Sequence, residues 1–182
     1  MRLARVLPAL VGLATRRIDR GGVKSALIRA TLGGASRAQL DAWTAQFVRT
    51  LLERGMYSDA LDVLGGHRRA GDQLVLLSAS TDLYVPAIGQ ALGFSEVLCT
   101  GVSWDGPQLV GRLTTANRRG AEKARCLAAL RDAHPGTSIT AYGNAASDLE
   151  HLRLADRGVL VNGSRRARRA AGSGGIECVQ WR

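Results

Sequence analysis

The polar side chains best placed to do chemistry follow a short apolar run near residue 140. The stretch SITAYG at 138–143 is typical of a strand, and Asn144 and Asp148 follow it before a helical pattern of leucines begins. Oxygen ligands at the end of a strand suit Mg²⁺, which takes few protein ligands and keeps several waters. Asn144 would ligate such an ion through its amide oxygen, and Asp148 would bind it or orient its water. The alternative for Asp148 is an N-cap or a favourable charge in a first helical turn.

A second polar feature is Ser78, which ends the strand-like run QLVLLS and precedes Ala79 and Ser80. A hydroxyl group and the backbone N–H groups at the start of a following helix would form a cradle for a phosphate. The alternative is an ordinary serine cap of that helix.

The third feature is Lys123, one of only two lysines in a chain with 25 basic residues. It falls in the first turn of a predicted helix, RGAEKARCLAALRDAH, where the helix dipole disfavours a cation. A compact ammonium group that approaches a phosphate would explain a lysine in an arginine-rich chain. An ordinary surface lysine is the alternative.

The elements that must position these side chains change in character near residue 70. Residues 1–70 predict helices, with Asp19 as a possible cap and with Ser36 and Gln39 at capping-box spacing. Residues 71–182 predict short strands that alternate with helices, and Asp105-Gly106 predicts a hairpin. We therefore expect an α/β fold in which a doubly wound, parallel, Rossmann-like core (71–182) follows a helical cap and return helix (1–70).

Composition favours a small globular protein in a reducing compartment. The formal net charge of +10 suggests nucleic acid or anionic surfaces as partners, but the strong preference for arginine over lysine indicates solvated arginine faces instead. Three widely spaced cysteines predict neither a disulfide framework nor a zinc site, so a cytoplasmic location is expected.

The apolar stretch near the N-terminus is too short to span a bilayer. We expect the arginine-rich segment 162–175 to be a solvated, frayed surface segment.

The order of these features resembles motifs two, three and four of the haloacid dehalogenase (HAD) superfamily. The resemblance rests on the strand with Ser78, then on Lys123 in RGAEK, and then on YGNAASD. The chain is most similar to the subgroup typified by phosphoserine phosphatase, in which a helical cap is inserted just after motif one. The segments LVLLSAS, GRLTTANRRGAEKARCL, AYGNAASDLEHLRLADRGVLVN and IECVQW follow that subgroup's pattern in order, so the likeness covers essentially the whole chain.

This resemblance implies a Mg²⁺-dependent hydrolase (phosphatase) of a small phosphorylated metabolite or a phospholipid headgroup. Ser78, with Ala79 beside it, would bind the transferring phosphoryl group, and Lys123 would neutralise its charge. Asn144 would be the metal ligand and Asp148 its supporting carboxylate. Such a site works by positioning and charge stabilisation more than by acid–base chemistry.

The sequence departs from the family pattern most severely at motif one. The family's nucleophile is the first aspartate of a D-x-D-G-T segment before the cap, and this sequence contains no D-x-D. The first core strand is therefore expected to be missing, and the chain as written to be inactive and less stable. Either Met1 lies inside a longer protein or the chain is a degenerate copy. Two smaller departures are Asn144, where an aspartate is frequent, and Ala145, where a serine is usual.

Two rival functions stay open at this point. A non-catalytic, regulatory HAD-like protein would keep phosphate affinity without turnover. A nucleic-acid binder rests on charge alone, and we expect no nucleic-acid partner. The substrate, the pathway and the oligomeric state are not indicated by the sequence.

Overall fold

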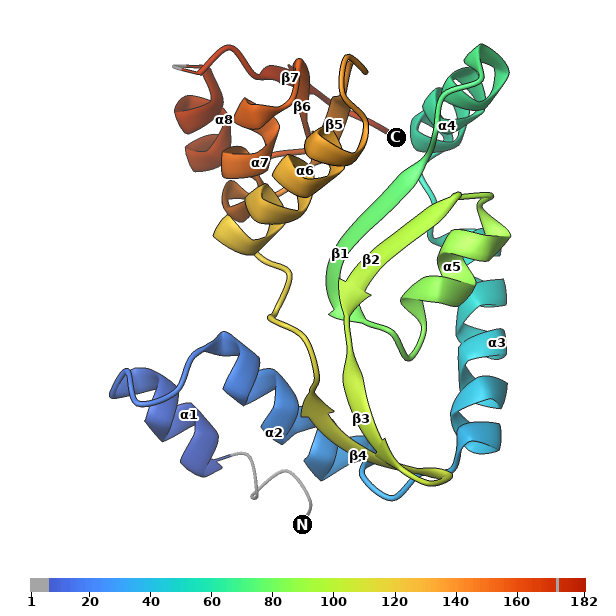
Figure 1. Ribbon diagram of the computed structural model, residues 1–182, viewed down its shortest axis with the longest axis vertical. Helices are drawn as coiled ribbons and strands as arrows, with labels where there is room; N and C mark the ends of the chain where they lie inside the picture. Colours follow the sequence, from blue (N-terminus) through green and yellow to red (C-terminus); the bar gives the residue numbers. More distant parts are fainter. Residues whose placement is uncertain (1–6, 173) are drawn as a thin grey trace. The chain divides into compact units, whose positions relative to one another are not determined.

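The computed structural model describes residues 7–172 and 174–182, and Figure 1 shows the succession of its helices and strands. Contacts divide the chain into two compact units, each made of two segments: Met1–Gly55 with Ser78–Asn117, and Met56–Leu77 with Arg118–Arg182. The predicted division at residue 70 into cap and core stays a prediction. Residues 1–6 of the apolar N-terminal stretch lie outside the described residues.

The first unit begins with helices that start where their capping residues predict. In α2 (Arg20–Leu32) the Asp19 carboxylate accepts the Gly22 N–H at 2.8 Å. Ser36 and Gln39 close both hydrogen bonds of a capping box at the start of α3 (Arg37–Arg54). These bonds satisfy backbone donors that a helix leaves unpaired at its N-terminus. The remaining N-terminal helix is α1 (Leu7–Ala14).

The strands of this unit form two short sheets. β1 (Val75–Thr81), of which Ser78–Thr81 belongs to this unit, pairs with β2 (Glu96–Thr100), and their arrows point the same way in Figure 1. The helix α5 (Val85–Ala91) lies between them in the chain. The predicted hairpin is confirmed: β3 (Val102–Asp105) and β4 (Gln108–Leu113) are antiparallel. Gly111 in β4 lets α2 approach closely, because a Cβ there would lie 2.7 Å from the Ile28 side chain. The buried core consists of Ile28, Leu40, Val102 and Leu109.

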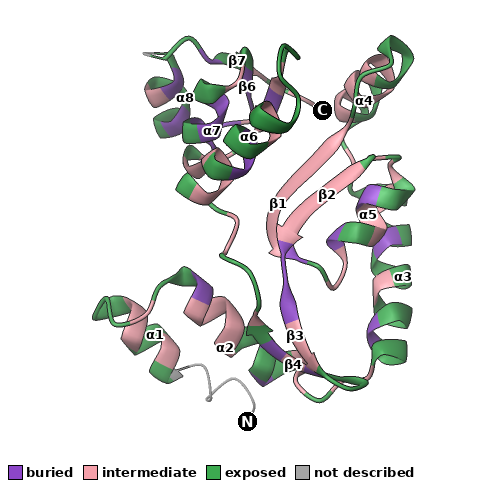
Figure 2. Ribbon diagram, viewed as in Figure 1, coloured by how far each residue is buried: buried purple, intermediate pink, exposed green. Residues whose placement is uncertain are grey.

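The second unit is built around a three-stranded parallel sheet of order β5-β6-β7. Its strands are β5 (Thr140–Gly143), β6 (Arg157–Val161) and β7 (Glu177–Val179). Its helices are α4 (Ser58–Ala70), α6 (Ala121–Ala133), the 3₁₀ turn η2 (Ala146–Asp148), α7 (Leu149–Leu154) and α8 (Arg165–Gly172). The central strand β6 is buried along four of its five residues, which Figure 2 shows in purple. A strand with neighbours on both edges and a helix layer over it is expected to be the most buried.

The predicted α/β class is confirmed, because helices alternate with parallel strands.

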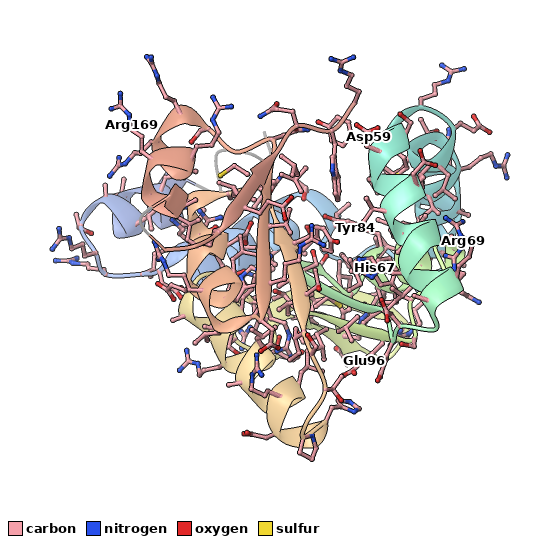
Figure 3. All side chains as sticks on the ribbon, turned by 90° about the horizontal axis from the view of Figure 1, so that it is seen from above. Asp59, His67, Arg69, Tyr84, Glu96 and Arg169 are labelled. Atoms are coloured by element: carbon pink, nitrogen blue, oxygen red, sulfur yellow. The ribbon has the colours of Figure 1, made fainter. Side chains whose placement is uncertain are left out.

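The segment 162–175 corrects an expectation, since α8 is an ordered part of the core. Ala167 and Ala171, four residues apart, are 1% and 0% exposed. The four arginines of α8 are exposed, and Arg169 extends away from the ribbon in Figure 3. The arginine-rich composition gave no sign of an amphipathic helix, because the buried face of α8 consists of alanines alone. None of the described helices is long and apolar enough to cross a membrane.

Candidate functional site

The second unit joins Lys123 and Asp148, two residues that the sequence singled out. Lys123 is the third residue of α6, and its Nζ lies 2.9 Å from Asp148 Oδ1. The side chains are 13% and 7% exposed, so the ion pair is largely shielded from water. The carboxylate offsets the unfavourable position of a cation in the first turn of a helix. Lys123 is therefore not an ordinary solvated surface lysine.

Asp148 is fixed by its own loop as well as by Lys123. Its Oδ2 accepts the backbone N–H groups of Asn144 at 3.1 Å and of Ala145 at 3.0 Å. Burial raises the pKa of the Asp148 carboxyl, but the hydrogen bond and charge of Lys123, together with the two N–H groups, outweigh burial and lower the pKa below its ordinary value. The carboxylate is thus kept ionised and oriented.

Gly143 makes this arrangement possible. The carboxylate of Asp148 folds back over the end of β5, and a Cβ on Gly143 would lie 2.6 Å from the Asp148 Cβ and 3.1 Å from its Cγ. Such separations are shorter than van der Waals contact, so a side chain at 143 would displace Asp148. The break in the apolar run after Tyr142 therefore serves the site, and not only the end of the strand.

Asn144 is exposed, and its loop presents oxygen atoms that suit a hard cation. No group of three His, Cys, Asp or Glu side chains gathers as a metal cage among the described residues. One exposed amide oxygen is compatible with Mg²⁺ only where water and phosphate complete the shell of the ion. Asn144 offers the exposed amide oxygen, and Asp148 holds the loop in place through the Asn144 N–H.

His151 is a residue that sequence reasoning missed. It lies on α7 one turn after Asp148, is 3% exposed, and donates to the Tyr142 carbonyl oxygen. Its Nδ1 has no hydrogen-bond partner in the described structure. Burial first, and then the charge of Lys123, lower the pKa of its ring, so the imidazole is neutral at pH 7. The available signal in the sequence was its three-residue spacing from Asp148.

Ser78 belongs to the first unit, and its surroundings correct one expectation. The strand does not end there: β1 continues to Thr81, and α5 begins only at Val85. The expectation that Ser78 ends the strand is therefore wrong, because the chain stays extended through Ala79 and Ser80. The Ser78 hydroxyl oxygen accepts the Ser80 N–H at 3.1 Å. The parts of Ser78 and Ala79 in phosphate binding stay predictions.

The other lysine of the chain also reaches β1. Lys24 on α2 donates from Nζ to the Ala79 carbonyl oxygen at 2.5 Å and to the Asn117 side-chain oxygen. Sequence reasoning noted Lys24 only for its rarity, and that rarity was the available signal. Each of the two lysines therefore donates a hydrogen bond within one of the predicted motifs: Lys24 to Ala79, next to Ser78, and Lys123 to Asp148.

Comparison with known proteins identifies the family of this chain. Residues 1–153 match the family described as haloacid dehalogenase-like hydrolase. A protein called CicA from Caulobacter vibrioides (strain NA1000 / CB15N) is 32% identical over 155 residues, which are 84% of this chain and 68% of CicA.

Solved structures agree with this at the level of the fold. A protein of unknown function from Bordetella pertussis Tohama I has a TM-score of 0.75 at 20% identity, covering 94% of this chain and 79% of that one. A probable phosphoserine phosphatase from Vibrio cholerae has a TM-score of 0.76 at 15% identity, covering 97% and 51%.

Proposed function

Because the chain belongs to the haloacid dehalogenase-like hydrolases, we propose that its site is a Mg²⁺-dependent phosphomonoester hydrolase site of the phosphoserine phosphatase type. The observation that carries the proposal is the shielded pair of Lys123 and Asp148 beside the Asn144 loop. A buried ammonium group next to exposed oxygen ligands suits a ligand that is both anionic and metal-bound, which is what a phosphate ester is. Solved phosphoserine phosphatases share the fold, which supports the same class.

In this proposal each residue acts by charge and position. Lys123 stabilises negative charge on the phosphoryl oxygens, and Asp148 keeps its ammonium group in place. Ser78 accepts a hydrogen bond from the Ser80 N–H, so its own proton can be donated to a phosphoryl oxygen. Ala79 would contribute its backbone to the phosphate site next to Ser78. None of these steps requires a group whose pKa lies near neutrality, because phosphoryl transfer depends mainly on positioning and electrostatics.

Magnesium, when bound, would neutralise charge on the phosphate. Asn144 would hold it through the amide oxygen, and Asp148 would support that loop and orient water. A binding readout independent of turnover is available, since protection of the Asn144 loop from proteolysis should rise with Mg²⁺ and should not rise in Asn144→Leu.

The rival function follows from the absence of a D-x-D segment in the sequence. Without that carboxylate nucleophile no phospho-aspartate forms, so we expect the 182-residue chain alone to bind phosphate without turnover. A regulatory or binding role is the second candidate for this reason. A cytoplasmic setting is part of the proposal, since Cys99, Cys126 and Cys178 form no disulfide among the described residues.

The decisive experiment compares two forms of the protein with an aryl phosphate, with Mg²⁺ and with a chelator. One is the 182-residue chain, and the other carries an additional N-terminal strand ending in D-x-D-G-T. We expect turnover only in the extended form with Mg²⁺, and a loss of orders of magnitude in Lys123→Ala. Turnover in that variant close to the parent rate would contradict the role of Lys123. Phosphate binding by both forms with turnover by neither would favour the binding protein.

A further inference from the structure

The first unit opens with a helix that carries no polar side chain. This helix, α1, has the sequence LPALVGLA and packs beside α2. Its Gly12 lies against Ile18 in the turn between the two helices, because a Cβ on Gly12 would lie 3.0 Å from the Ile18 Cγ1. A helix that is apolar on all sides is normally buried. The other sides of α1 are therefore expected to be covered as well.

One side of α1 is instead open to solvent. Leu10 and Val11 are 48% and 58% exposed, and Ala14, one turn after Leu10, is exposed too. Residues at this spacing are neighbours on the surface of a helix. We call these three residues the α1 face. Because burial of apolar side chains is favourable, an exposed face of this kind has the properties of a contact surface.

Three exposed arginines border the end of the α1 face. The turn after α1 folds back on the helix, since the Arg16 N–H donates to the Leu13 carbonyl oxygen at 3.1 Å and the Arg17 N–H donates to the Gly12 carbonyl oxygen at 2.8 Å. Arg20 follows as the first residue of α2, where the helix dipole disfavours a cation. All three arginines are exposed, so the apolar face ends in a cluster of positive charge.

This cluster is part of a charge asymmetry along the chain. Residues 1–40 contain eight basic residues and one acidic residue, Asp19, and therefore carry seven of the ten net positive charges. The Asp19 carboxylate is engaged as the cap of α2. The preference for arginine explains which basic residue is used, but it does not explain why the charge is concentrated here. Such asymmetry is typical of chains that bind nucleic acid or a membrane surface.

The apolar face and the charge together favour one class of partner. A nucleic acid would pair with the arginines but would leave Leu10 and Val11 in water. A second copy of the chain would cover the apolar face but would bring two clusters of like charge together, which is unfavourable. A bilayer with anionic headgroups accepts apolar side chains directly below a layer of negative charge, so it satisfies both features.

We propose that the α1 face, with Arg16, Arg17 and Arg20, binds the surface of an anionic lipid bilayer, and that Leu10 and Val11 insert next to the headgroups. The eight residues of α1 have a length of about 12 Å, so the helix lies on the bilayer and does not span it. This inference concerns the first unit alone and does not depend on the proposed hydrolase site.

The test measures co-sedimentation of the 182-residue chain with vesicles of phosphatidylcholine, and with vesicles of equal parts phosphatidylcholine and phosphatidylglycerol. The three arginines should together make binding to the mixed vesicles about a hundredfold tighter than to the neutral ones. Added salt should weaken this binding, because it screens the attraction between the charges. Equal binding to the two kinds of vesicle, or binding to neither, would overturn the inference.

Two variants test the apolar contact. Leu10→Gln and Val11→Gln should each weaken binding to the mixed vesicles by about tenfold, because each removes an apolar side chain from the contact. Leu61→Gln is the matched control, since Leu61 is 41% exposed but lies on α4 in the other unit, and it should leave binding unchanged. Circular dichroism checks the fold of each variant. An equal loss in Leu61→Gln would overturn the inference.

The charge is tested by Arg17→Gln combined with Arg20→Gln. This double variant should weaken binding to the mixed vesicles by about 25-fold and leave binding to phosphatidylcholine unchanged. The matched control combines Arg165→Gln with Arg168→Gln, which removes the same charge from exposed positions of α8. This control should leave binding to the mixed vesicles close to that of the parent. If it weakens binding as strongly, the bilayer responds to net charge alone and the inference is overturned.

Two further measurements separate the bilayer from a second copy as the partner. The mixed vesicles should protect the peptide bond after Arg17 from trypsin, while cleavage in α8 continues. Sedimentation without vesicles should give the same mass for the parent and for Val11→Gln. A dimer that dissociates in Val11→Gln would assign the α1 face to a second copy, and an unprotected bond after Arg17 would place the bilayer contact elsewhere. Either result would overturn the inference.

Discussion

Lys123 and Asp148 form a 2.9 Å ion pair across 25 residues of sequence, and both side chains are largely shielded from water. The pair resolves the oddity of a lysine in the first turn of a helix, because the carboxylate supplies the negative charge that the helix terminus favours. It also concentrates the charge of the site at one point, next to the exposed Asn144 loop. The consequences of this pairing can be measured.

Removal of Lys123 should destabilise the fold as well as abolish phosphate binding. Lys123→Met leaves Asp148 buried without its counter-charge and should lower the free energy of unfolding by about 3 kcal/mol, measured by urea denaturation. Arg125→Met on the same helix is the matched control, since its ion pair with Glu122 is 3.0 Å long but Arg125 is 74% exposed. The control should change stability by less than about 0.5 kcal/mol. Equal losses in the two variants would contradict a shielded pair.

Acid should destabilise the protein through Asp148. Because the folded-state pKa of this carboxyl is lowered, the unfolded chain takes up the proton first as the pH falls. The stabilisation is therefore full above the ordinary pKa of 3.8 and is lost as the pH falls through the lower folded value. Urea titrations across this range should show a shallower decline in Asp148→Asn. Asp41→Asn, at an exposed carboxyl on α3, should keep the decline, and a wild-type decline in Asp148→Asn would refute the assignment.

His151 should add a second pH dependence nearer neutrality. Its folded-state pKa is lowered from 6.5 by burial and by Lys123, so below pH 6.5 the unfolded chain binds a proton that the folded chain resists. Stability should fall as the pH drops below 6.5 and level off below the folded pKa. His151→Gln should remove this slope, as measured by the urea midpoint on either side of 6.5. His134→Gln, at an exposed position, should retain it. A slope that survives in His151→Gln would show that another group titrates.

Gly143→Ala should damage the site without removing any of its polar atoms. The new Cβ would lie 2.6 Å from the Asp148 Cβ, and the strain of such overpacking costs about 1–3 kcal/mol in free energy of unfolding. Displacement of Asp148 should also weaken phosphate binding, which calorimetry can follow.

Gly66→Ala is the opposite case and serves as the control for Gly143→Ala. A Cβ on Gly66 meets nothing within 4 Å, and the residue lies inside α4, so alanine should stabilise the protein by about 0.5–1 kcal/mol. If Gly143→Ala also proves neutral or stabilising, Asp148 does not lie over the end of β5 as described.

Much of the local structure could be predicted because its causes lie within a few residues. The caps at Asp19 and Ser36, the hairpin at Asp105-Gly106 and the alternation of strands and helices all follow from short patterns. Errors arose where one composition fits two environments. The composition of 165–172 predicts a solvated segment, yet its alanines pack on the core, and β1 extends past Ser78 to Thr81.

The sequence by itself therefore determined the α/β class and the residue types of the site, because periodicity, capping and motif order act over short spans of chain. Only the tertiary structure decided that Lys123 meets Asp148, that Lys24 reaches Ala79 over 55 residues, and that His151 is buried. Contacts of this kind depend on how whole elements pack. Their energies come from burial and charge at points where distant segments meet, and no local pattern records those points.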